Sequence, residues 1–141
     1  MYPSPNIQDA KDAKIEPSRR LDRLARTVIG AAIEVHRHLG PGYLEGVYEE
    51  ALAVELRLRG VLFERQKAIA VTYKGHNVGE GRVDLLVGDE LLVELKAVEA
   101  LAPIHKAQLL SYLKAMGCHL GLLINFNVPV LRAGVQRVVL S

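Results

Sequence analysis

Charged side chains inside apolar, strand-forming segments are the feature that most restricts how this chain can fold. Residues 83–95 read VDLLVGDELLVEL, which is two apolar runs separated by the turn signal Gly88-Asp89. Each run contains one acid, Asp84 in the first and Glu94 in the second. A buried charge is unfavourable unless it is paired or binds a metal ion. These strands are therefore either exposed to solvent or carry the two acids for a chemical purpose.

Strand geometry predicts that the two acids converge. Side chains two residues apart on a strand point to the same face, so Glu94 and Lys96 share one face and the apolar residues between and beside them share the other. Asp84 is expected to face away from its apolar neighbours, which are Val83, Leu85 and Val87. Antiparallel pairing through the turn then places Asp84 and Glu94 on one patch.

A patch of this composition suits a hard divalent cation. Two neighbouring carboxylates repel each other unless a cation lies between them, and Mg²⁺ prefers oxygen ligands. A metal ion acidifies a water that it binds, and Lys96 beside it can orient that water or stabilise developing negative charge. The spacing alone leaves an alternative open, which is an ordinary hairpin whose Lys96 pairs with Glu94 or Asp84 on a solvent-exposed face.

Helical spacing predicts three helices around these strands. The first is expected over residues 18–39, with Ser18 as its N-cap and residues 40–42 (Gly-Pro-Gly) ending it. The second is expected to begin at Tyr43 or Leu44 and to run to about residue 59. Its expected buried stripe is Leu44, Val47, Ala51, Val54 and Leu58. The third begins at Pro103, ends at Met116 and is followed by Gly117.

The remaining apolar segments predict strands. FERQKAIAVTYKG, RVDLLV and LLVELKAV form a three-stranded meander, and LGLLINF and VQRVVL add two strands after the third helix. The order α-α-β-β-β-α-β-β predicts an α/β fold with a mixed central sheet flanked by helices. We expect one domain over residues 18–141, preceded by a polar, flexible N-terminal arm over residues 1–17.

Polar groups recur on the helix that follows the third strand. His105, Gln108 and Tyr112 lie three and four residues apart and therefore line one face, whereas Leu109 and Leu113 lie towards the other. A short crossover can place this helix beside the sheet face that carries the acids. The alternative is a polar, solvent-exposed helix face.

Composition excludes several other classes. No run approaches the roughly 20 apolar residues that span a bilayer, and the N-terminus lacks the apolar segment of a secretory signal. With Cys118 as its single cysteine, the chain forms no internal disulfide, and we expect a reduced, cytoplasmic setting. The net charge of +2 is too small to predict nucleic-acid binding by itself.

The ordered set of motifs resembles a known family. GRVDLLVGDELLVELK resembles the D-x(n)-(D/E)-x-K core of the PD-(D/E)xK nuclease superfamily, with Val83 where the name has proline, and QLLSY resembles a Q-x-x-x-Y element of its exonuclease-like branch. GYLEGVY, residues 42–48, is similar to the signature of the GxxExxY family of small bacterial proteins. The resemblance extends from about Leu21 to Leu140 and implies a restriction-endonuclease-like αβββαβ core with an extra N-terminal helix.

The resemblance also implies roles for individual residues. Glu45, Asp84 and Glu94 would hold Mg²⁺ or Mn²⁺, with the Leu95 carbonyl as a further candidate ligand. Lys96 would be the catalytic lysine. Gln108 and Tyr112 would support the site or the substrate phosphate. Glu45 has a simpler alternative role, which is to complement the helix dipole in the first turn, and Glu55 is a reserve candidate.

Two functions follow as hypotheses. The first is a divalent-metal-dependent nuclease that hydrolyses DNA phosphodiester bonds, with nucleic acid as its partner and no membrane association. The second is a non-catalytic oligomeric or partner-binding module that retains the nuclease fold, because the chain is short and only mildly basic. A homo-oligomer is expected under either hypothesis, since it would pool basic surface and multiply sites.

Overall fold

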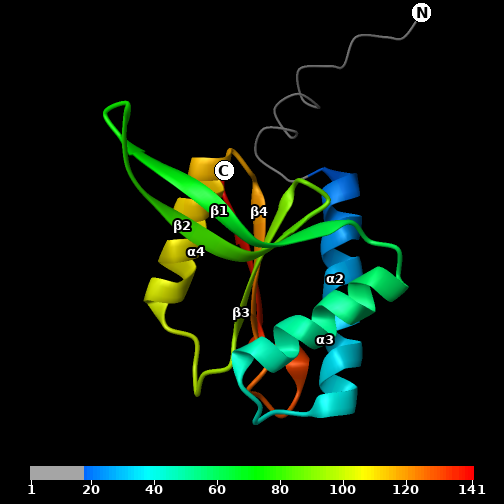
Figure 1. The fold of residues 1–141 in the computed structure, drawn as a ribbon. Coiled ribbons are helices and arrows are strands. Elements are labelled where there is room, and N and C mark those ends of the chain that lie inside the picture. Colours follow the sequence, from blue (N-terminus) through cyan, green and yellow to red (C-terminus); the bar gives the residue numbers. More distant parts are fainter. Residues whose placement is uncertain (1–17) are drawn as a thin grey trace, which may run out of the picture.

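The computed structural model describes residues 18–141, so the expected N-terminal arm lies outside the described residues. A five-stranded sheet forms the middle layer, α2 and α3 cover one face, and α4 covers the other (Figure 1). The helices are α2 (Arg19–Leu39), α3 (Glu45–Leu58), α4 (Pro103–Met116) and the 3-10 helix η1 (Leu131–Gly134). The strands are β1 (Phe63–Tyr73), β2 (His76–Val87), β3 (Leu91–Lys96), β4 (Leu120–Asn125) and β5 (Val135–Val139). Apart from η1, which lies between β4 and β5 and was not predicted, the order of these elements along the chain is the one that the sequence predicts.

Strand order in the sheet follows the chain, β1-β2-β3-β4-β5. Neighbours are antiparallel except β3 and β4, which are parallel. A parallel pair needs a crossover connection, and α4 supplies it by running between these two strands on one face of the sheet. The sheet is therefore mixed, and the α/β fold class with flanking helices is confirmed.

Local signals set the helix ends as predicted. The Ser18 hydroxyl accepts a hydrogen bond from the Leu21 N–H at 3.1 Å and caps α2. Gly117 follows α4 with φ of 68°, in the left-handed region that glycine adopts at little cost. Both helix ends therefore lie where the sequence predicts them.

Two apolar cores lie on opposite sides of the sheet. The core under α2 and α3 takes Val93 and Leu95 from β3, whereas the core under α4 takes Leu92. Strand β4 is buried along its whole length because helices cover both of its faces. Strand β3 is buried from Leu91 to Leu95, so Glu94 is carried by a strand segment with no solvent-exposed face.

Helix α3 buries a different face from the predicted one. Tyr48, Leu52 and Leu56 are fully buried, whereas four members of the predicted stripe are exposed: Leu44 is 82% exposed, Val47 41%, Val54 52% and Leu58 77%. The prediction was wrong because α3 carries two apolar rows. The row of Tyr48, Leu52 and Leu56 is the buried one because the Tyr48 ring stacks on Phe126, with 4.5 Å between ring centroids. The Tyr48 hydroxyl also donates a hydrogen bond to the Gly40 carbonyl at 2.6 Å.

The hairpin of β1 and β2 is longer than predicted. Strand β2 begins at His76 rather than Arg82, and the far half of the hairpin, residues 71–80, is exposed (Figure 1).

The face of the sheet to which the side chains of β2 point also changes along the strand. Val83 packs into the core under α4, whereas Leu85 packs into the core under α2 and α3. The expectation that Val83 shares a face with Leu85 is therefore wrong, and the alternation breaks at Asp84 between them.

Among residues 18–141, no helix is both long enough and apolar enough to cross a membrane.

Candidate active site

Asp84 and Glu94 meet where β2 and β3 separate. The paired register of these strands runs from Val87–Leu91 to Leu85–Val93. At the next position the Asp84 N–H donates to Oε1 of Glu94 at 2.8 Å, and Oδ2 of Asp84 accepts the Leu95 N–H at 2.7 Å. Carboxylates thus take the places that backbone carbonyls occupy in an ordinary ladder. The structure brings this predicted pair together.

Burial acts strongly on both carboxyl groups. Glu94 is only 6% exposed, and its burial together with the charge of Asp84 raises its pKa to about 7, against the opposing effects of the Asp84 N–H and Lys96. Burial also raises the pKa of Asp84, although the hydrogen bond from Leu95 opposes this. A buried pair with raised pKa values is typical of functional sites.

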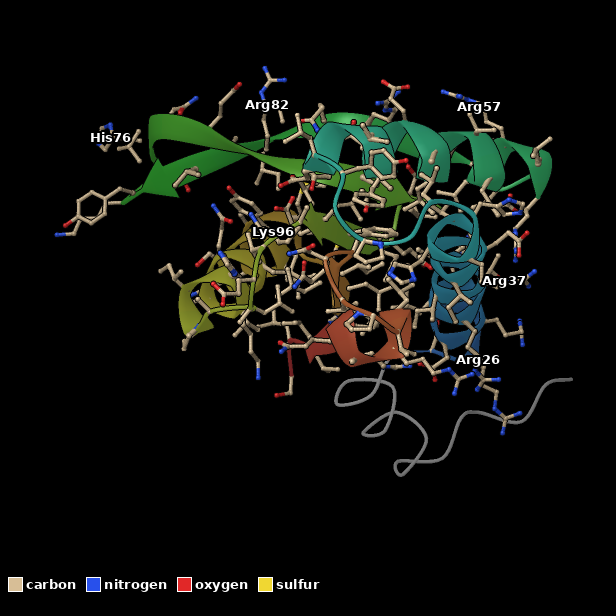
Figure 2. The ribbon with its side chains drawn as sticks, turned by 90° about the horizontal axis from the view of Figure 1, so that it is seen from below. Arg26, Arg37, Arg57, His76, Arg82 and Lys96 are labelled. Carbon is tan, nitrogen blue, oxygen red and sulfur yellow. The ribbon has the colours of Figure 1, made fainter. Side chains whose placement is uncertain are left out.

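Lys96 ends β3 and is half-buried beside this pair. The positive charge of Lys96 opposes the increase in the pKa values of Asp84, Glu94 and Glu45, so Lys96 lies within electrostatic range of all three. Within residues 18–141 it forms no ion pair. Figure 2 shows it near the middle of the molecule, whereas Arg26, Arg37 and Arg57 lie at the outer surface of the helices. These facts speak against the alternative of a solvent-exposed hairpin with Lys96 paired.

Glu45 approaches the same site from α3, where it is the first helical residue. Its pKa is raised by burial first and by the charge of Asp84 next, while Lys96 opposes both. These couplings place Glu45 near the acids of the sheet, so its role is not limited to the helix dipole. The reserve candidate Glu55 lies elsewhere, because it accepts a hydrogen bond from Nε of Arg59 at 2.8 Å.

Glu49 and Gln66 complete a network that the sequence interpretation missed. The Gln66 side-chain amide donates to Oε1 of Glu49 at 2.6 Å and to Oδ1 of Asp84 at 3.2 Å. Arg65 fixes the other oxygen of Glu49 through Nη2 at 2.8 Å and Nε at 3.0 Å. Asp84 is therefore held at one oxygen by Leu95 and at the other by Gln66.

The backbone of Gln66 is unusual for a strand residue. Its φ is 51°, a left-handed conformation that non-glycine residues adopt rarely, and it lies inside β1. Strain of this kind is concentrated at functional sites. One sequence signal pointed to Glu49: it follows Glu45 by four residues and so shares its face of α3. No sequence signal predicts the conformation of Gln66.

The predicted residues of α4 are less closely joined to this site. Tyr112 is half-buried and packs so tightly on Gly81 that a Cβ there would lie 2.5 Å from its ring. Gln108 is exposed. His105 accepts a hydrogen bond from the Ala102 N–H at 3.0 Å and so serves the start of the helix. Within residues 18–141, no hydrogen bond connects Gln108 or Tyr112 to the acids of the sheet.

The acids fit a hard divalent cation in donor type and in charge. Glu45, Asp84 and Glu94 offer only oxygen donors, and Glu45 and Glu94 both have pKa values raised in part by the charge of Asp84. A cation among them would offset that repulsion. In the described part of the chain, no three His, Cys, Asp or Glu residues are arranged closely enough to hold a metal as they stand.

The fold and the position of its acids define a class: an α/β nuclease fold with an acid on each of two diverging strands and a lysine two residues beyond the second. A match to the PD-(D/E)XK nuclease superfamily covers residues 22–138, and the chain belongs to this superfamily. Its core is restriction-endonuclease-like, as predicted. Members of the superfamily generally use divalent metals.

The comparison with solved structures found the crystal structure of an alkaline exonuclease, LHK-Exo, from Laribacter hongkongensis. The two chains are 14% identical, with a TM-score of 0.49, and the match covers 92% of this chain and 74% of that chain. No curated protein matches the sequence. Membership of the GxxExxY family stays a prediction.

Proposed function

We propose that this chain is a divalent-metal-dependent nuclease that hydrolyses DNA phosphodiester bonds. The observation that carries the proposal is the buried pair of Asp84 and Glu94, joined through main-chain N–H groups and left without a cationic partner among the described side chains. Burying two acids side by side destabilises a fold, so their presence is best explained by a bound cation.

Each residue has a role in this proposal. Asp84 and Glu94 would hold Mg²⁺ or Mn²⁺ with Glu45 as a third ligand, which requires side-chain rotation from the present arrangement. A cation held there would supply an acidified water and would neutralise charge on the scissile phosphate. Lys96 donates a hydrogen bond to a phosphate oxygen and stabilises the negative charge that develops there. Gln108 and Tyr112 contact the substrate from α4.

Positioning of Asp84 is assigned to residues outside the predicted set. Gln66 holds Oδ1 of Asp84, and Glu49 with Arg65 holds Gln66. Partners of this kind fix the orientation of a metal ligand before the metal arrives. The proposal therefore needs no movement of the β2 backbone when the cation binds.

Cleavage of DNA by the purified chain tests the proposal. Single-stranded and double-stranded DNA are incubated with Mg²⁺ or Mn²⁺, and RNA of the same sequence is tested in parallel. We expect DNA hydrolysis that Lys96→Ala and Glu94→Gln abolish while the circular dichroism spectrum stays native. Lys106→Ala removes an exposed lysine of α4 and is the matched control. Hydrolysis that survives in Lys96→Ala and Glu94→Gln would overturn the mechanism.

A partner-binding module with the nuclease fold is the second candidate function. The exposed apolar residues of α3 favour it, because contiguous apolar surface marks interaction sites. It predicts no metal binding by calorimetry and a stable assembly in light scattering. Tight metal binding at Asp84 and Glu94 would contradict a purely non-catalytic module.

A further inference from the structure

One face of α3 presents an apolar row to solvent. The row consists of Leu44, which immediately precedes the helix, and of Val47, Ala51, Val54 and Leu58 within it. Apart from Ala51, which is partly buried, its members are between 41% and 82% exposed. Single exposed apolar residues need no explanation, but a continuous row along a helix does.

The spacing of this row is that of a helix-pairing seam. Its members follow one another at intervals of three, four, three and four residues, which is the a/d pattern of a heptad repeat. Helices with this pattern pack side by side, each side chain entering a gap on the facing helix. The core side chains of α3, which are Tyr48, Leu52 and Leu56, are fully buried beneath the helix, so pairing through the exposed row would disturb none of them.

Charges beside the row make it complementary to itself. Glu50 and Arg57 occupy the same flank of α3, at the g positions of the two heptads. Both are exposed. Within its own chain Glu50 accepts hydrogen bonds from Arg65 at 2.7 and 3.2 Å, and the Arg57 guanidinium lies 5.4 Å from the centroid of the Phe63 ring. If two copies of α3 pair in antiparallel orientation, each Glu50 lies opposite the partner's Arg57. The same two-fold axis relates both pairs, as an isologous interface requires.

A hollow at the end of α3 fits this arrangement. It has a volume of about 380 Å³ and is lined by Arg57, Val61, Leu62, Phe63 and Arg65. In the antiparallel register that places Ala51 opposite the partner's Val54, the partner's Leu44 falls opposite Val61, at this hollow. Leu44 is 82% exposed, so the hollow receives a side chain that otherwise has no packing partner.

We propose that the chain forms a homodimer in which α3 packs antiparallel on α3 of a second copy. Two features favour a second copy over an unrelated partner. The flanking charges Glu50 and Arg57 are complementary to each other across a two-fold axis, and Leu44 of one copy falls at the hollow beside Val61 of the other. Residues 1–17 are largely polar in sequence and offer no matching heptad row. Glu45 and Glu49 lie on the opposite side of α3 from the seam, so the dimer leaves the candidate active site open. The proposal does not depend on nuclease activity.

Sedimentation analysis of the full chain across a range of protein concentrations tests the proposal. We expect a concentration-dependent species of twice the 15.5 kDa mass of one chain. Val54→Glu and Leu58→Glu should each weaken the dimer by at least about tenfold, because each places two carboxylates in one seam. Ile104→Glu changes a side chain of α4 that is 69% exposed, and it should leave the dimer intact.

A charge exchange tests the orientation of the pair. Arg57→Glu should weaken the dimer by opposing two acids, and adding Glu50→Arg should recover part of the affinity, because Glu50→Arg also removes the ion pair with Arg65 of the same chain. Truncation of residues 1–17 should leave the chain dimeric. A monomer at all concentrations would overturn the proposal. So would a dimer that Val54→Glu and Leu58→Glu leave unchanged, or a dimer that the truncation abolishes.

Discussion

The main-chain N–H of Asp84 is bound by the carboxylate of Glu94, with 2.8 Å between N and Oε1. The reverse contact runs from the Leu95 N–H to Oδ2 of Asp84 at 2.7 Å. The two acids therefore separate β2 from β3 and hold the gap open with their own side chains. This arrangement stores unfavourable electrostatic free energy in a buried site, and each prediction about the site depends on it.

Removing one charge of the pair should stabilise the protein. In a metal-free buffer with chelator at neutral pH, we expect Glu94→Gln to raise the free energy of unfolding by roughly 1–3 kcal/mol, because the amide keeps an acceptor for the Asp84 N–H and removes the repulsion. Thermal and urea denaturation measure the change. Glu99→Gln, which alters an exposed carboxylate, is the control and should have little effect. A destabilised Glu94→Gln protein would contradict the electrostatic account.

The same pair predicts how stability depends on pH. The folded pKa of Glu94 is raised to about 7 from an ordinary value of 4.5, so the folded state binds this proton more tightly than the unfolded state does. The stabilisation from this group is complete below pH 4.5 and is lost as pH rises through about 7. Urea denaturation with chelator should show that the free energy of unfolding of Glu94→Gln increases relative to that of wild type as pH rises through this window. A constant difference between the two proteins would contradict the shift.

Much of the fold follows from the sequence because its signals are local. Ser18, Pro103 and Gly117 mark helix ends through their own backbone and side-chain chemistry, and the Gly88-Asp89 turn sets the pairing of β2 with β3. The choice between two apolar rows of α3 was not predictable in this way. It depends on Phe126, which is distant in sequence and supplies the stacking partner of Tyr48.

The candidate site was predictable in part for the same reason. Alternation along β3 brings Glu94 and Lys96 to one face, and this needs no knowledge of distant residues. Gln66 could not be found, because its role arises from a left-handed φ of 51° inside β1 and from contacts to α3 and β2 together. A tertiary conformation of this kind has no signature in a run of residues.

The contacts of Gln66 predict that it is a positioning residue. Gln66→Gly removes the amide and, at φ of 51°, introduces no backbone strain, so the fold should be retained. We expect metal affinity, measured by calorimetry, to fall by about 10–100-fold. Lys74→Gly is the matched control, since Lys74 has φ of 49° at the hairpin tip far from the acids. Equal metal affinity in both variants would show that Gln66 does not position Asp84.

Tyr48 should contribute to the stability of the fold and not to metal binding. Tyr48→Phe removes the hydrogen bonds to the Gly40 carbonyl at 2.6 Å and from the Tyr43 N–H at 3.2 Å, while the ring stays packed on Phe126. We expect a loss of about 1–2 kcal/mol in the free energy of unfolding. Metal affinity per folded molecule should be unchanged. A fall in metal affinity without a fall in stability would assign Tyr48 to the site instead.

Metal binding should stabilise the wild-type protein through the same acids. At Mg²⁺ or Mn²⁺ about 100-fold above the dissociation constant, linkage predicts a gain of about 2.7 kcal/mol. The thermal midpoint should therefore rise with added metal in wild type and in Glu99→Gln, and not in Glu94→Gln. A rise of the same size in Glu94→Gln would place the metal at other residues.

The most direct test of the central claim is a crystal grown or soaked with Mn²⁺ and measured at a wavelength where manganese scatters anomalously. The account predicts an anomalous peak between the carboxylates of Asp84 and Glu94, with Glu45 rotated towards it and Gln66 still bound to Asp84. Absence of a peak at this position under saturating Mn²⁺, with the two carboxylates unchanged, would contradict the claim that the pair is a metal site.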